Sequence, residues 1–156
     1  MTDAVVAGAL VVAALNAAAG VLGGWLWYRG APASEPRWTN AFWVLLRVGQ
    51  GAALTLAVAV GSLVAAGKGA SDQLFYLYAL LPLAVGFVAE QLRIASAQTI
   101  LDQRGLPNAE AVGGLPQAEQ QALVGAIVRR EIGVMALSAL VVVFLALRAA
   151  GTAHGF

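Results

Sequence analysis

The chain has 156 residues, of which 60% are hydrophobic and 11% are charged, and its formal net charge at pH 7 is +1. Soluble domains are about half apolar and about one quarter charged, so this composition excludes an ordinary water-soluble fold. The length leaves room for four or five membrane crossings of about 20 residues each, and no basic stretch indicates nucleic acid.

Several kinds of chemistry are excluded by the residue types that the chain lacks. It has no cysteine, which rules out disulfides, thiol redox chemistry and thiolate metal sites. His154 is the single histidine, so no pair of imidazoles can ligate a haem. Ser96, Thr99 and Asp102 have no base with which to form a catalytic triad. We therefore expect no catalytic residue, metal site or cofactor, and a protein that is not an enzyme.

The first predicted membrane helix covers residues 4–28. It ends in Trp25, Trp27 and Tyr28, whose amphipathic rings suit the headgroup level of a bilayer. A cleaved secretory signal would begin with basic residues, whereas the only early charge here is Asp3. We therefore expect this helix to be retained.

Three residues in the first predicted helix indicate contact with another helix. Asn16 lies in its middle, where a polar amide surrounded by lipid seeks a partner. Gly20 and Gly24 follow at the four-residue spacing that permits close helix approach. That contact can form within the bundle or between two copies of the chain.

The second predicted membrane helix covers residues 41–66, with Thr39 or Asn40 as its N-cap. Arg47 lies about one and a half turns inside it, and Gln50 lies about one turn deeper. A charge inside the hydrocarbon costs about 2.5–3.5 kcal/mol on insertion scales, so such a side chain normally faces the bundle interior and has a partner.

The third predicted membrane helix covers residues 74–95. Its apolar run turns polar at Glu90, Gln91 and Arg93. Good helix formers follow, and no Gly or Pro intervenes before Gly105. The helix should therefore continue to about residue 103.

The fourth predicted membrane helix covers residues 130–150 and follows an amphipathic helix, residues 116–129, without a break. A continuous helix of this length would be about 52 Å long, whereas the hydrocarbon is about 30 Å thick. The third and fourth helices should therefore project together from one membrane face. We call this predicted helical hairpin, residues 96–129, the stalk.

These elements predict an all-α integral membrane protein with a single domain, a four-transmembrane-helix bundle whose third and fourth helices extend into a short cytoplasmic hairpin. Of nine Lys and Arg residues, only Lys68 and Arg148 lie on the side of the termini. The remaining seven predict that connectors 29–40 and 104–116 are cytoplasmic, with both termini outside a bacterial-type inner membrane.

One candidate intramembrane polar site follows from the antiparallel course of the second and third helices, which brings Arg47 and Glu90 to a similar depth. We expect them to form an ion pair, with amide side chains beside it. Arg93 lies one turn from Glu90 and can pair with it or with the fourth helix. The candidate residues are Arg47, Gln50, Glu90, Gln91, Arg93 and Glu131.

Two functions fit this site. In the first, the Arg47–Glu90 pair is an interhelical clamp in a non-catalytic accessory, assembly or scaffold subunit, which contacts the lipid bilayer and a protein partner or a second copy. In the second, Glu90 is a proton or cation site and Arg47 its gate, in a small ion or solute transporter or channel. We favour the clamp because the charged side chains all lie within reach of the membrane interface.

Overall fold

The computed structural model describes residues 2–30 and 36–155. These ranges contain five helices and no strand: α1 (Thr2–Arg29), α2 (Pro36–Ala65), α3 (Leu74–Gln103), α4 (Ala109–Gly113) and α5 (Gln117–Thr152). All except α4 are long and apolar enough to cross a membrane. The prediction of an all-helical chain with four such helices is confirmed.

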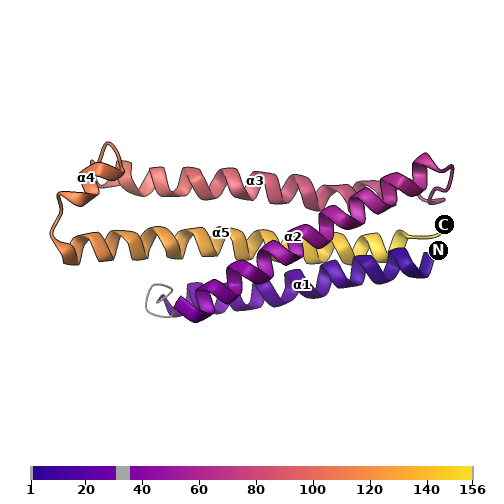
Figure 1. The fold of residues 1–156 in the computed structure, drawn as a ribbon, viewed down its shortest axis with the longest axis horizontal. Coiled ribbons are helices and arrows are strands. Elements are labelled where there is room, and N and C mark those ends of the chain that lie inside the picture. The colour runs from indigo at the N-terminus through magenta and orange to yellow at the C-terminus, as the bar shows by residue number, and fades with distance from the viewer. Residues whose placement is uncertain (1, 31–35, 156) are drawn as a thin grey trace.

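The long helices pack around α5, which lies between α1 and α3 and contacts both along much of its length (Figure 1). In that view α2 crosses the bundle diagonally; it packs mainly on α1 and makes fewer contacts with α3. Both termini and the turn from α2 to α3 lie at one end. At the other end, α3 and α5 extend beyond α1 and α2 and are joined through α4.

The second helix begins at Pro36, earlier than the predicted residue 41. The prediction that Thr39 or Asn40 is its N-cap is wrong, because both residues lie within α2. Proline suits the first position of a helix, since the N–H that it lacks would have no intrahelical partner there. The predicted connector 29–40 is correspondingly shorter, and its residues 31–35 lie outside the described ranges.

The stalk is a continuation of the two apolar helices. The 30 residues of α3 and the 36 residues of α5 correspond to about 45 Å and about 54 Å. Leu101 and Ser96 of α3 and Leu123 of α5 are buried. The loop between the helices is ordered by Asn108, whose side chain accepts a hydrogen bond of 3.0 Å from the Ala111 N–H and caps α4.

Small residues allow α1 to approach its neighbours closely. A Cβ added to Gly20 would meet Leu140 of α5, and one added to Gly23 would meet Phe42 of α2 and Ala136 of α5. A Cβ on Gly24, in contrast, would meet nothing within 4 Å. Gly20 therefore lies in a helix contact inside the bundle, whereas Gly24 faces open space and Gly23 is the second packing glycine.

Two neighbouring glycines therefore provide a matched test of this packing. We expect Gly23→Ala to lower the free energy of unfolding by about 1–3 kcal/mol, because the Phe42 ring is fully buried and has no room to move. Gly24→Ala should be neutral or stabilising by up to about 1 kcal/mol, since alanine favours a helix over glycine. Unfolding in detergent, followed by circular dichroism, measures both; equal shifts would contradict the packing.

Candidate functional site

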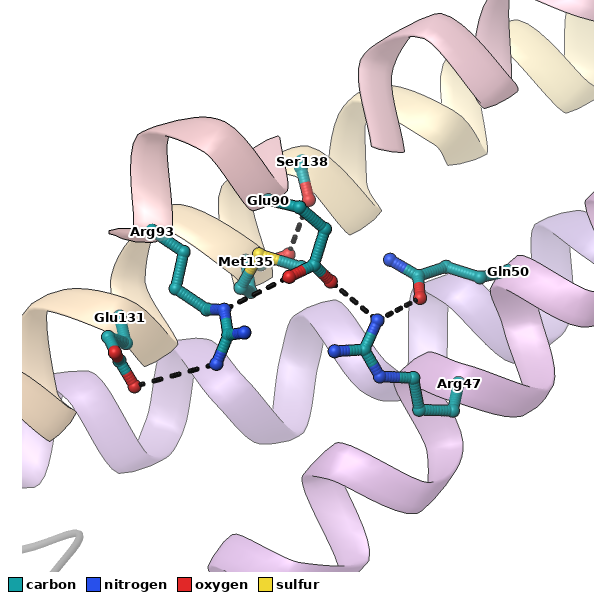
Figure 2. A network of polar contacts seen from close by, with 7 residues as sticks. All are labelled: Arg47, Gln50, Glu90, Arg93, Glu131, Met135 and Ser138. Atoms are coloured by element: carbon teal, nitrogen blue, oxygen red, sulfur yellow. Dashed lines mark hydrogen bonds and ion pairs between the residues drawn. The ribbon is translucent and has the colours of Figure 1, made fainter. Parts of the chain in front are cut away.

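Four charged side chains form a chain of contacts across three helices (Figure 2). Arg47 Nη1 of α2 lies 2.5 Å from Glu90 Oε1 of α3, and Arg93 Nε lies 3.0 Å from Glu90 Oε2. Arg93 Nη1 also lies 4.0 Å from Glu131 Oε2 of α5. Each carboxylate oxygen of Glu90 thus contacts a different guanidinium. We call Arg47, Glu90, Arg93 and Glu131 the ion-pair chain.

The predicted amides beside the ion-pair chain differ in their positions. Gln50 lies one turn from Arg47 on α2, and its Oε1 accepts a hydrogen bond of 2.7 Å from Arg47 Nη1. The same nitrogen contacts Glu90 (Figure 2), so Gln50 helps to hold the guanidinium in place. Gln91 is exposed and lies outside this group of contacts. The structure therefore brings five of the six predicted residues together.

The ion-pair chain is partly buried and balanced in charge. The side chain of Glu90 is 24% exposed and that of Glu131 is 20% exposed, whereas Arg47 is 51% exposed. Arg93 also lies over the ring of Trp43, 5.5 Å from its centroid. Two arginines and two glutamates leave no net charge. A balanced, partly buried group of this kind is expected to fasten helices together, because removing one member leaves another without its counterion.

A cavity of about 320 Å³ lies beside the ion-pair chain, between α2, α3 and α5. Gln50 and Glu90 line it, and Asn16 and Ser138 are its other polar side chains. Along α3 the lining extends from Glu90 to Pro82, a distance of about 12 Å. Most of the lining is apolar, so the cavity is a largely hydrophobic space with a few polar groups.

Asn16 is buried against α2. Its Nδ2 donates a hydrogen bond of 2.9 Å to the Val12 carbonyl within α1. A Cβ added to Gly49 of α2 would lie 2.9 Å from the same nitrogen. Gly49 therefore lets α2 pass close to the Asn16 amide, so Asn16 contacts the neighbouring helix through packing while it donates to its own backbone.

The cavity includes residues that we did not predict from the sequence. Ser138 of α5 lines it, and its hydroxyl donates a hydrogen bond of 2.8 Å to the Met135 carbonyl (Figure 2). Gly49 and Gly86 line it from α2 and α3. The available signal was that Gly49 directly precedes Gln50 and that Gly86 lies one turn before Glu90, since small residues beside polar ones commonly mark helix contacts in membranes.

Among residues 2–30 and 36–155, no group of three His, Cys, Asp or Glu side chains could hold a metal ion. Comparisons of the chain with known protein families, with curated proteins and with solved structures found no match. The described residues contain four helices that are long and apolar enough to cross a membrane, and this suggests the class of multi-pass membrane proteins.

Glu90 is the junction of the ion-pair chain, so its replacement should be the most destabilising. We expect Glu90→Gln to lower the free energy of unfolding by about 1–3 kcal/mol, between the values for exposed and fully buried pairs. Glu131→Gln should cost less than about 1 kcal/mol, because its contact with Arg93 is longer.

Unfolding in detergent, with a double-mutant cycle over Arg47→Gln and Glu90→Gln, measures the coupling directly. Glu119→Gln is the matched control, since Glu119 is exposed in the first turn of α5. If Glu90→Gln and Glu119→Gln were equally stable, the ion-pair chain would have no role in holding the helices together.

Proposed function

We propose that this protein is a non-catalytic accessory, assembly or scaffold subunit of a bacterial-type inner-membrane assembly, with the stalk as its docking element. The observation that carries the proposal is the length of the two stalk helices. They extend past α1 and α2 as a two-helix hairpin (Figure 1). Within the part of the chain that the structure describes, each stalk helix packs on the other helix and the α4 loop beyond the ends of α1 and α2.

A two-helix hairpin buries one side of each helix and leaves the others free. Leu101 and Leu123 are buried in the stalk, whereas Val124 is 49% exposed. The same two helices carry exposed glutamines such as Gln98 and Gln121. A surface that combines apolar and neutral polar side chains, with few charges, suits contact with another protein. The partner is a different membrane protein or a second copy of this chain.

The ion-pair chain supports the same function. It joins α2 to α3 and α5 close to the point where the stalk begins. Because its charges balance, the contact between helices needs no further ion. This arrangement provides a fixed base from which the stalk projects, as a docking element requires.

The distribution of arginines favours a cytoplasmic stalk. Lys68 and Arg148 belong to the end that carries the termini. The other seven Lys and Arg residues, all arginines, lie on the ion-pair chain or toward the stalk end: Arg29, Arg37, Arg47, Arg93, Arg104, Arg129 and Arg130. By the positive-inside rule, this bias supports both termini outside and the connectors in the cytoplasm.

Photo-crosslinking tests the docking role. A benzophenone amino acid that replaces Val124 should form a discrete adduct in native membranes, because this stalk residue would contact the partner. The same amino acid in place of Val58 is the control, since Val58 is 61% exposed on the apolar span of α2 and should face lipid. Mass spectrometry distinguishes a second copy from another protein. No adduct at Val124, with a lone monomer in mild detergent, would overturn the proposal.

A transporter or channel is the second candidate, and the cavity favours it. The cavity reaches both Gln50 and Glu90 and has Asn16 and Ser138 in its lining. An ion or small solute that entered it would meet these polar groups. Purified protein in liposomes would then show proton- or cation-dependent flux that Glu90→Gln abolishes and Glu119→Gln preserves. Absence of flux from the unmodified protein would exclude this candidate.

A further inference from the structure

We propose that a second hollow, a groove between α1 and α5 near the stalk, binds one phospholipid with an anionic headgroup. The groove has a volume of about 830 Å³, within the range of about 300–1,000 Å³ that is typical of ligand sites. Its lining includes Gly24 and Trp27 of α1 and Arg129, Arg130 and Leu137 of α5. The proposal requires that the chain lies in a membrane, and it is independent of the docking role of the stalk.

The part of the groove on the membrane side of the arginines matches one leaflet of a bilayer. The lining extends along α5 from Ala126 to Leu140, and its segment from Arg130 to Leu140 is about 15 Å long at about 1.5 Å per residue. Half of the hydrocarbon thickness is also about 15 Å. From Arg130 toward Leu140, the α5 side of the groove is apolar, with Val134, Leu137 and Leu140. An acyl chain that lay in the groove would therefore have its headgroup at the level of the arginines.

Two glycines give the groove its shape. A Cβ added to Gly133 would lie 2.7 Å from the Trp27 ring, so the absence of a side chain lets the ring lie directly against α5. A Cβ added to Gly24, one turn before Trp27, would meet nothing within 4 Å. This second glycine leaves the α1 wall open, which provides the space that a chain of methylenes needs.

The two arginines give the stalk end of the groove a positive charge that no acidic residue of the described ranges pairs with. Arg129 Nε donates a hydrogen bond of 3.0 Å to the Trp27 carbonyl, and its guanidinium lies over the Trp27 ring, 5.6 Å from the centroid. This holds Arg129 in place through one nitrogen and leaves the two terminal nitrogens to bind a phosphate. Arg130 is exposed and forms no ion pair with any residue of the described ranges.

Among residues 2–30 and 36–155, no acidic residue lines the groove. Glu131, the neighbour of Arg130 in the sequence, is directed to Arg93 in the ion-pair chain. The groove differs in charge from the cavity beside the ion-pair chain, because the charges next to that cavity balance. Basic pockets between membrane helices on the cytoplasmic side are a recognised type of site for anionic headgroups. The charge of the groove therefore favours a lipid with net negative charge over a zwitterionic one.

Lipid retention in nanodiscs tests the proposal. The protein is placed in nanodiscs with equal amounts of phosphatidylglycerol and phosphatidylcholine and released into a native mass spectrometer. We expect one retained phosphatidylglycerol. Each arginine should contribute about fivefold to the preference, so Arg129→Gln with Arg130→Gln should reduce it about 25-fold. Arg104→Gln, a matched change of charge on an exposed residue outside the groove, should leave the preference unchanged.

A second variant fills the groove without changing any charge. Gly24→Leu has room for its side chain and should abolish lipid retention, whereas Gly61→Leu is its control on α2, where a Cβ also meets nothing within 4 Å. Circular dichroism of both variants checks that they remain folded. Equal retention of the two lipids by the unmodified protein would overturn the proposal. So would unchanged retention in both Gly24→Leu and the double arginine variant.

Discussion

The bifurcated contact of Glu90 is the interaction on which the arrangement of the helices depends. One carboxylate oxygen contacts Arg47 of α2, and the other contacts Arg93 of the same helix, α3. Glu90 therefore binds α2 directly and holds Arg93, whose guanidinium in turn reaches Glu131 of α5. Helix α2 packs mainly on α1 and has fewer contacts with α3. The long side chain of Arg47 therefore makes a connection that backbone proximity does not provide.

This uneven packing creates two openings, one beside a balanced set of charges and the other beside a positive charge. Gly20, Gly23 and small residues of α5 bring α1 and α5 together in the middle of the bundle, and the basic groove lies where they diverge near the stalk. The separation of α2 from α3 leaves the other cavity, which borders the ion-pair chain. A paired set of charges holds helices, whereas an unpaired set attracts a ligand of opposite charge. The protein thus uses arginine for two purposes.

Hydropathy and chain order predicted the helices, the stalk and the Arg47–Glu90 contact, because depth along a helix follows directly from the sequence. Lateral packing does not follow in this way. A chain with 18 glycines offers the Gly20–Gly24 spacing by composition alone, and only the way in which α2 and α5 pack on α1 makes Gly23 a contact and leaves Gly24 open. The groove and the cavity depend on this side-by-side packing of helices, so neither could be derived from periodicity.

The two candidate functions make opposite demands on the same carboxylate. A clamp requires that both guanidiniums stay on Glu90, whereas a proton or cation site requires that at least one of them leaves when the ion arrives. Arg47 is the residue that would leave, because its side chain is half exposed while Arg93 is held by Glu131 and by the face of Trp43. Gln50 opposes this movement by binding the same Arg47 nitrogen that contacts Glu90. The geometry around Arg47 thus stabilises the closed contact, which is why the clamp is the function that the polar site supports best.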